Sequence, residues 1–299
     1  MDALLSLSND LAAAVERVRG AVVAVNARPR LPSTGVHWRP GIIVTADHTV
    51  RSDEDITIIA PDGRTVAASL VARDPGTDLA VLRVHDTDLP LADLGDPGSL
   101  KVGHIVLAVG HGPRVSWGVV SALGGRWRTW RGGEIDQLMR LDLTLYPGFS
   151  GGPLVDVKGR VVGINTSGLS RQLELAIPVS TVTRVADELI DKGHVSRGFL
   201  GVGLQPAHLP EAFRRRLTGA SEIGLLVVNV QPDGPAAKAG VLLGDVLVAL
   251  DGAPVGATED VQAVVGARRA GSTVTATILR AGAPAEVSMT VGERPSRRR

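Results

Sequence analysis

The chain has 299 residues, enough for about two domains, and 44% of them are apolar while only 3% are aromatic, so its core must consist mainly of Val, Leu, Ile and Ala. Its net charge of +1 gives no reason to expect a nucleic-acid partner. The absence of cysteine excludes disulfides, thiolate metal sites and a cysteine nucleophile.

The first 20 residues are predicted to form a short amphipathic helix, because Leu4, Leu11, Val15 and Val18 recur at roughly helical spacing. Polar residues interrupt this stretch and it has no early Lys or Arg, so it lacks the features of a signal peptide. No run approaches the ~18 uninterrupted apolar residues of a membrane span. We therefore expect a cytoplasmic protein, or an exported one whose leader is absent from this chain.

Short Val- and Ile-rich segments separated by glycine and proline follow the predicted helix, such as "AVVAVNA", "GIIVTA", "DLAVLRV" and "HIVLAVG". "PDGR" at 61–64 and "VKGR" at 157–160 are typical of hairpin turns. Many short strands of this kind predict an all-β barrel or sandwich. A helix is predicted over 180–194, capped by Ser180 and ended by Gly193.

That helix closes a first domain of residues 21–192, and a second domain is predicted over 197–292. The second one alternates strands and turns with a helix that begins at Thr258, and it ends in a β-hairpin, so we expect a compact α+β module. Residues 293–299 are polar and arginine-rich, and are predicted to be a disordered basic tail.

A serine lies between glycines in "YPGFSGGP", residues 146–153. Nucleophilic catalysis by serine needs a base, a group that orients the base, and donors for the oxyanion. His48 directly follows an apolar strand, and Asp78 opens another strand in a way that predicts its burial. Each feature alone is common at structural positions, but the order His48, Asp78, Ser150 predicts a catalytic set.

Three segments resemble the signature regions of trypsin-like serine proteases, and more narrowly those of the HtrA/Deg branch: "TADHTV", "DPGTDLAVLRV" and "YPGFSGGPLVDVKGRVVGINT". "WGVVSALGG" and "LELAIPVSTVTRVADELIDKG" are also similar to that branch. The resemblance covers about residues 20–292. It implies a mostly β fold, a chymotrypsin-like double β-barrel with the site between the barrels, followed by a small α+β PDZ domain.

The resemblance also implies roles for the site residues. Ser150 would attack the peptide carbonyl, His48 would be the general base and then the general acid, and Asp78 would hold the tautomer of His48. The backbone N–H groups of Gly148 and Ser150 would form the oxyanion hole. No metal or cofactor is implied.

Phe149 and Asp47 depart from the family pattern, which usually has Asn at position 149 and small or neutral residues at position 47. Phe149 has three interpretations: it packs into the barrel interface and holds the loop, it turns the N–H of Gly148 away in a resting enzyme, or it marks a non-catalytic relative. Asp47 is expected to face away from His48, whose pKa it would raise if it reached the ring.

The substrate pocket implied by the resemblance is formed by the segment before the nucleophile and by one residue after Gly163: Thr144, Leu145, Tyr146 and Leu169. Position 144 carries no acid, so cleavage after Lys or Arg is not expected. The apolar Leu145 favours an aliphatic P1 residue, the residue whose carbonyl is attacked.

"RGFLGVGLQ" at 197–205 and "PAAKAGVLLGDVLVALDGAPV" at 235–255 resemble a PDZ domain, which adds a C-terminal peptide to a sheet edge. The family binds the peptide carboxylate through the loop that here comprises Phe199, Leu200, Gly201 and Val202. The alternative is that these glycines only make turns and that the module serves interdomain contacts.

Loop 124–133 interleaves Arg with Trp, and we expect a regulatory loop with cation–π contacts rather than a nucleic-acid surface. The predicted N-terminal helix resembles the region through which the family assembles, commonly as trimers, although it could equally pack on its own barrel.

Together these features predict an ATP-independent serine endopeptidase that cleaves unfolded or damaged proteins in protein quality control, with a PDZ domain that binds C-terminal or extended peptides. The rival hypothesis is a degenerate or latent protease fold that acts as a chaperone or scaffold through its PDZ domain.

Overall fold

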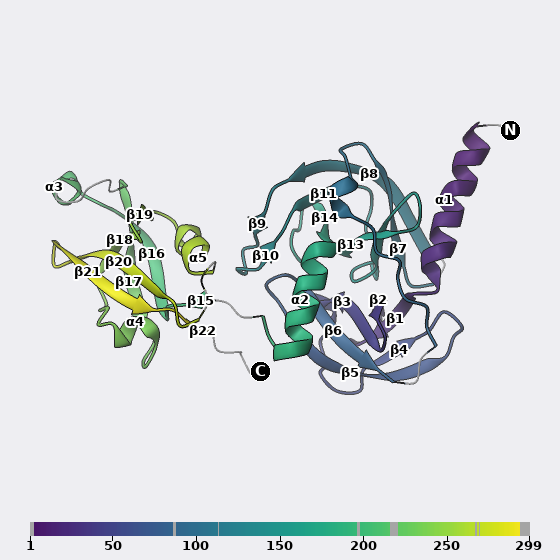
Figure 1. Ribbon diagram of the computed structural model, residues 1–299, viewed down its shortest axis with the longest axis horizontal. Helices are drawn as coiled ribbons and strands as arrows, with labels where there is room; N and C mark the ends of the chain where they lie inside the picture. Colours follow the sequence, from purple (N-terminus) through teal and green to yellow (C-terminus); the bar gives the residue numbers. More distant parts are fainter. Residues whose placement is uncertain are drawn as a thin grey trace. The chain divides into compact units, whose positions relative to one another are not determined.

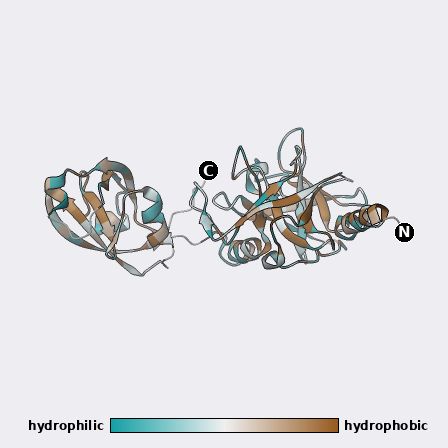
Figure 2. Cartoon of the chain, turned by 90° about the horizontal axis from the view of Figure 1, so that it is seen from above, coloured by the Kyte–Doolittle hydropathy of each residue, from teal (hydrophilic) through white to brown (hydrophobic). Residues whose placement is uncertain are grey.

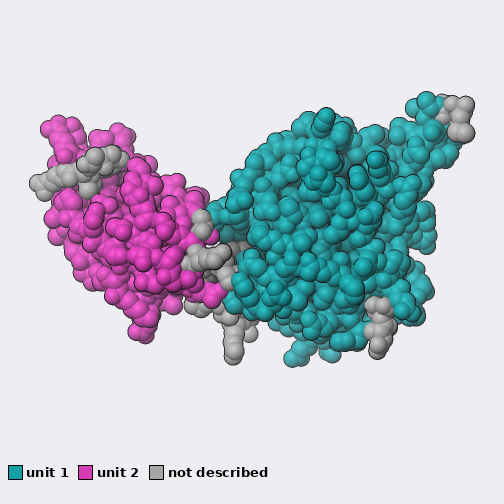
Figure 3. Space-filling view, in the orientation of Figure 1, with its two compact units in different colours: residues 1–195 teal, residues 196–299 magenta. Residues whose placement is uncertain are grey.

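The computed structural model describes residues 3–85, 88–112, 114–195, 198–215, 221–266, 268 and 270–293. The chain divides into two compact units, residues 1–195 and 196–299, which Figure 3 shows in different colours. Among the described residues, no helix has both the length and the apolar character needed to cross a membrane.

The first unit contains two closed six-stranded β-barrels, which confirms the predicted double-barrel fold (Figure 1). The strand order of the first barrel is β1-β2-β3-β6-β5-β4 and that of the second is β11-β14-β13-β12-β7-β8. The strands of the first barrel are β1 (Val22–Asn26), β2 (Ser33–Arg39), β3 (Ile42–Ala46), β4 (Thr57–Ile59), β5 (Thr65–Asp74) and β6 (Leu79–Val84). Those of the second are β7 (Ile105–Gly110), β8 (Arg114–Gly124), β11 (Leu138–Asp142), β12 (Pro153–Asp156), β13 (Val161–Thr166) and β14 (Glu174–Pro178).

Both predicted hairpin turns join antiparallel strands: the first connects β4 with β5, and the second connects β12 with β13. Two short 3₁₀ helices, η1 (Asp47–Thr49) and η2 (Pro97–Ser99), and a two-stranded ribbon of β9 (Trp127–Arg128) and β10 (Glu134–Ile135) complete the barrels' connections.

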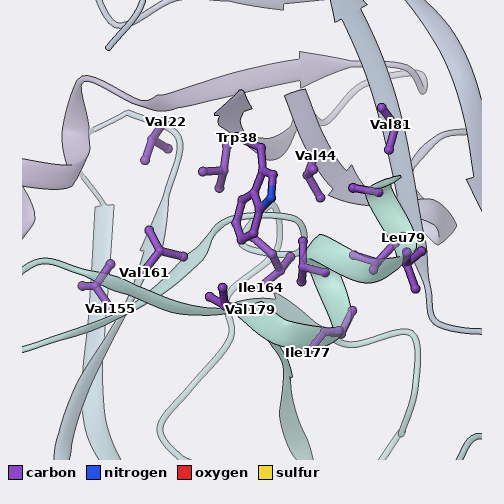
Figure 4. Close-up of a cluster of buried hydrophobic side chains, with 14 of the residues drawn as sticks. Val22, Trp38, Val44, Leu79, Val81, Val155, Val161, Ile164, Ile177 and Val179 are labelled. Carbon is purple, nitrogen blue, oxygen red and sulfur yellow. The ribbon is translucent and has the colours of Figure 1, made fainter. Parts of the chain in front are cut away.

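The barrel strands separate two kinds of apolar core because successive side chains point to opposite faces. On β3, Ile43 faces the interior of the first barrel, while Ile42 and Val44 face a second cluster that also takes side chains from the other barrel. Figure 4 shows this shared cluster around Trp38. The barrels are therefore joined by a continuous apolar layer, which holds the loops at their junction in fixed positions.

Helix α2 (Val179–Lys192) packs on this layer and ends the first unit. Its apolar face is turned to the protein, because Val182, Val185, Ala186 and Leu189 are all buried. Gly193 ends it in the left-handed conformation with φ of 76°, as expected. The predicted cap was wrong: the helix begins one residue earlier, its N-cap is Pro178, and Ser180 lies inside the first turn.

Helix α1 (Ala3–Arg19) buries only its second half, at Ala14 and Val18. There Arg17 donates a 2.7 Å hydrogen bond to the carbonyl of Lys158 in the β12–β13 turn. Leu4 and Leu5 near its start are 74% and 55% exposed. The helix thus packs partly on its own barrel and leaves apolar side chains uncovered.

The second unit is a sheet of order β16-β17-β18-β20-β21 with short helices and a separate β15–β22 pair. Its apolar side chains gather in a large cluster and a smaller one, and the hydropathy colouring in Figure 2 shows the apolar strands. Its elements are β15 (Gly198–Phe199), β16 (Val202–His208), α3 (Glu211–Arg214), β17 (Ile223–Val230), α4 (Pro235–Lys238), β18 (Val246–Leu250), β19 (Ala253–Pro254), α5 (Thr258–Gly266), β20 (Thr273–Arg280), β21 (Ala283–Thr290) and β22 (Gly292–Glu293).

Candidate active site

His48 and Asp78 form a tightly held pair at the junction of the barrels. His48 lies in η1, directly after β3, and Asp78 directly precedes β6. The Nδ1 atom of His48 is 3.0 and 2.8 Å from the two carboxylate oxygens of Asp78, and the backbone N–H of His48 donates to the same carboxylate at 2.9 Å. Asp78 is fully buried and has a φ of 60°, so the fold holds it in a costly conformation.

The end of β13 and the loop that follows it supply further contacts to this pair. Thr166 donates a hydrogen bond from its hydroxyl to Asp78, and the N–H of Gly168 donates to the Thr166 hydroxyl at 2.9 Å. A Cβ atom at position 168 would lie 2.5 Å from the Asp78 carboxylate and 2.6 Å from His48 Nδ1. Glycine at position 168 is therefore required for the loop to lie against the pair.

The hydroxyl of Ser167 lies between Ser150 and His48. Its Oγ is 3.0 Å from Oγ of Ser167, which in turn is 3.4 Å from Nε2 of His48. The N–H of Ser167 also points to Ser150 Oγ at 3.4 Å. The three residues selected from the sequence are thus brought together, with Ser167 placed between the nucleophile candidate and the base. Hydrogen bonds of this kind often tighten only when substrate binds.

Replacing Ser167 with alanine is expected to speed the reaction of Ser150 with a fluorophosphonate. The Ser167 hydroxyl competes with Ser150 for the lone pair of His48 Nε2, and a hydrogen bond of this kind is worth about 0.5–1.5 kcal/mol, or roughly two- to tenfold in rate. The measurement is the labelling rate at neutral pH. Ser167→Thr keeps the hydroxyl and should react like the wild type, whereas slower labelling of Ser167→Ala would show that the hydroxyl assists Ser150.

The nucleophile loop places glycine where a side chain cannot fit. At Gly151, with φ of 85°, a Cβ atom would lie 2.2 Å from the carbonyl oxygen of Thr34. Gly148 has φ of 95°, and its carbonyl accepts a 2.7 Å hydrogen bond from the Thr34 hydroxyl. Within the described residues, the backbone N–H groups of Gly148 and Ser150 have no hydrogen-bond partner. Both groups are therefore free to donate to a ligand oxygen.

Phe149 packs inside the second barrel and is 1% exposed. A Cβ atom at Gly110 would lie 2.7 Å from its ring, and Tyr146 meets it edge-on at a centroid distance of 5.6 Å. The guanidinium of Arg114 lies 5.6 Å from the ring centroid. Phe149 thus anchors the loop, but to the interior of the second barrel and not to the layer between the barrels.

Arg114 and His111 brace the other side of the same loop. Arg114 Nη2 is 2.7 Å from His111 Nε2, and Nη1 donates to the carbonyl of Pro147 at 3.4 Å. Burial lowers the pKa of His111, and the neighbouring Arg114 lowers it further. The neutral ring therefore accepts the hydrogen bond from Arg114 at neutral pH.

The expected pocket residues fall into two groups. Thr144 and Tyr146 are exposed and Leu145 is half-buried, in the segment that leads to Ser150. Leu169 is only 8% exposed and packs in the apolar layer between the barrels.

The cations of loop 124–133 have partners in or next to the loop. Arg126 and Arg128 each bind one carboxylate oxygen of Glu134 at 2.9 Å, and Arg131 stacks on Trp130 at 4.5 Å from the ring centroid. The expected cation–π contact is confirmed. The loop also contacts the segment before Asp78, since the hydroxyl of Thr129 donates to the carbonyl of Gly76.

Asp47 is buried beside Arg73, whose Nη1 is 3.6 Å from its Oδ1. Burial raises the pKa of Asp47 to about 6; Arg73 opposes the shift, and the nearby Asp78 and Asp74 add to it. Its charge partner is Arg73 and not His48.

Asp47→Asn is expected to raise the free energy of unfolding by about 1–2 kcal/mol at pH 8, with the gain falling towards zero at pH 4. The folded protein holds the Asp47 proton up to about pH 6, whereas the unfolded chain releases it near its ordinary pKa. Ionisation therefore costs stability as the pH rises between these values, and the cost is complete above pH 6.

Urea unfolding followed by tryptophan fluorescence measures this effect in the first unit, because Trp38, Trp117, Trp127 and Trp130 are all there. Asp53→Asn removes an exposed partner of the same arginine and is the control. A gain that grows towards acid pH would contradict the account.

In the second unit, the four expected peptide-binding residues lie together before and at the start of β16. Leu200 is buried, Gly201 has φ of 77°, and Val202 begins the strand. β16 is an edge strand that pairs on one side with β17, among the described residues. Its other side therefore offers backbone groups to an added strand.

No cluster of three His, Asp or Glu side chains suited to a metal ion occurs in the part of the chain that the structure describes.

The chain matches the profile of the trypsin-like peptidase domain over residues 33–164 and that of the PDZ domain over residues 198–291. A probable periplasmic DegP-like serine endoprotease of Pseudomonas fulva (strain 12-X) is 37% identical over 269 residues, covering 86% of this chain and 55% of the relative. One from Rhizobium meliloti (strain 1021) is 39% identical over 280 residues, covering 90% and 55%. The chain thus spans about half the length of these curated relatives.

Two solved structures are similar to this chain over nearly the whole length of both chains. The HtrA-type protease AlgW with a decapeptide has a TM-score of 0.74 and 31% identity, covering 95% of this chain and 99% of that one. The serine endoprotease from Yersinia pestis also has a TM-score of 0.74 and 31% identity, covering 95% and 98%.

Proposed function

This chain belongs to the HtrA-type serine proteases, a trypsin-like peptidase domain followed by a PDZ domain, and we propose that it is an ATP-independent endopeptidase of unfolded or damaged proteins. The observation that carries the proposal is the buried Asp78 carboxylate on Nδ1 of His48, with Ser150 one hydroxyl from Nε2. The peptidase activity, its substrates and its partners are proposed for this chain.

The proposed reaction begins when Ser150 Oγ moves from Ser167 to Nε2 of His48. Oγ then bonds to the carbonyl carbon while its proton passes to Nε2, and Asp78 stabilises the imidazolium that forms. The N–H groups of Gly148 and Ser150 donate to the oxyanion. His48 returns the proton to the leaving amine, and water releases the acyl group by the same steps.

The N–H groups of the loop Phe199–Val202 are proposed to hold the carboxylate of a C-terminal peptide that adds to the edge of β16. The exposed Leu4 and Leu5 support a homo-oligomer contact through α1, with a trimer as the proposed assembly. The curated relatives are named as periplasmic proteases, and an exported location is proposed for this chain too.

The rival function is a latent or degenerate protease fold that acts through its PDZ domain. The observation in its favour is that Ser167 lies between Ser150 and His48.

Hydrolysis of unfolded casein without ATP tests the proposal, with Ser150→Ala as the control. Wild-type cleavage that the variant lacks is expected. No cleavage by the wild type, with or without hydrophobic C-terminal peptides added, would favour the rival.

A further inference from the structure

Glu174 is the first residue of β14 and lies at the rim of the second barrel's interior. Leu175 and Ile177 on this strand face the layer between the barrels, whereas Ala176 belongs to the interior cluster. Because side chains alternate along a strand, Glu174 is on the same face as Ala176. Its neighbour across the pairing with β11 is Leu141, a member of the interior cluster. An acidic side chain thus lies at the margin of the apolar cluster that fills the second barrel.

The Glu174 carboxylate lies near the segment that leads to Ser150. Burial raises the pKa of Glu174, and the nearby backbone N–H of Leu145 lowers it by less. Leu145 belongs to the same apolar cluster, at its half-buried margin. Glu174 therefore lies beside the expected substrate pocket, on the strand opposite the nucleophile segment.

No cationic side chain of the described residues forms an ion pair with Glu174. It is half-buried and still reaches solvent. A partly desolvated carboxylate without an ion-pair partner among the described residues gains from an added cation, because an ion pair there is screened less than at the surface.

We propose that Glu174 makes the substrate pocket selective for Lys or Arg at P1, with its carboxylate as the partner of the P1 cation. This specificity rests on the proposed peptidase function of Ser150. It reverses the aliphatic P1 preference expected from the sequence. That expectation followed from the apolar Leu145 and from the absence of an acid at position 144. The guanidinium of Arg suits the site especially, since it can donate two parallel hydrogen bonds to one carboxylate.

The alternative is that Glu174 only anchors the N–H of Leu145. Glu174→Gln separates the two roles, because its amide oxygen can still accept a hydrogen bond from that N–H while the charge is gone. Asp142→Asn is the matched control: it removes an exposed carboxylate next to Leu141 on β11, the strand paired with β14.

The first test is the binding of p-aminobenzamidine, a small cationic P1 mimic, measured by its fluorescence on the wild type, Ser150→Ala and both carboxylate variants. Binding needs no turnover, so it tests the pocket even if Ser150 is inactive. We expect Glu174→Gln to bind at least about tenfold more weakly, since a hydrogen bond to a charged group is worth about 1.5–3 kcal/mol. Wild type, Ser150→Ala and Asp142→Asn should bind alike. Equal binding by Glu174→Gln, or no binding by the wild type, would overturn the inference.

The second test is the ratio of kcat/KM for two peptides that differ only in Arg or Leu at P1. The wild type should favour Arg, and the ratio should fall at least about tenfold in Glu174→Gln. A wild type that favours Leu overturns the inference but leaves the peptidase in place. Fluorophosphonate labelling of the same samples reports on Ser150 separately, so loss of the peptidase function is distinguished from loss of the specificity.

Discussion

Ser150→Ala is expected to lower kcat/KM for peptide hydrolysis by about 10⁵-fold or more, because the reaction loses its nucleophile and the proton transfer to His48 with it. Ser150 is 7% exposed, and its hydroxyl hydrogen-bonds only to Ser167 within the described residues. Its loss should therefore leave the fold intact. The measurement is hydrolysis of a fluorogenic peptide, with circular dichroism as the folding check.

Ser99→Ala is the matched control for that experiment, since Ser99 lies in η2 on the surface and its hydroxyl donates to the local carbonyl of Asp96. It should hydrolyse the peptide at the wild-type rate. If Ser150→Ala retained more than about one hundredth of the wild-type rate, the nucleophile would have to be another group.

Asp78→Asn is expected to lower kcat/KM by about 10⁴-fold at neutral pH. The asparagine amide would donate to Nδ1 of His48, so the ring would carry its proton on Nε2 and could not accept one from Ser150. Asp78 also accepts hydrogen bonds from Thr166 and from the N–H of His48, so the variant should be somewhat less stable as well.

The tautomer of His48 separates the catalytic effect from lost stability. Nitrogen NMR of ¹⁵N-labelled protein should show the proton on Nδ1 in the wild type and on Nε2 in Asp78→Asn. A variant that is folded, has the Nε2 tautomer and still cleaves peptide within tenfold of the wild type would contradict the assigned role of Asp78.

The sequence was sufficient for the barrels because their strands are short apolar runs bounded by glycine turns. It did not reveal β2, whose Ser33, Thr34 and His37 are polar and yet buried. Two of them have partners in distant segments: His37 Nδ1 is 3.0 Å from the carbonyl of Pro90, and the Thr34 hydroxyl donates to the carbonyl of Gly148. Burial of polar side chains by long-range hydrogen bonds leaves no periodic apolar pattern to read.

The order of His48, Asp78 and Ser150 indicated the site, but the groups that adjust it lie at the end of β13, in the loop after it and on β14. Thr166 ends the fully buried β13, Ser167 and Gly168 follow it, and that change from apolar to polar residues was the available signal. Glu174 gave a clearer signal, because it is an acid at the start of the apolar strand "ELAIP". Neither Glu174 nor the polar residues after β13 could be assigned a role before the strand pairing was known.

Phe149 shows how a departure from the family pattern is resolved by packing. From the sequence its ring had three interpretations. Its position under the loop, against Gly110 and Tyr146, shows that the aromatic ring fills the second barrel. The N–H groups of Gly148 and Ser150 have no partner among the described residues, so this packing is compatible with an oxyanion hole.

Fluorophosphonate labelling of the wild-type protein, with the modified residue located by mass spectrometry, tests the central claim most directly. The account predicts one labelled residue, Ser150, and no labelling of His48→Ala. Labelling at any other residue, or an unlabelled wild type that still binds hydrophobic C-terminal peptides, would contradict it and favour the scaffold function.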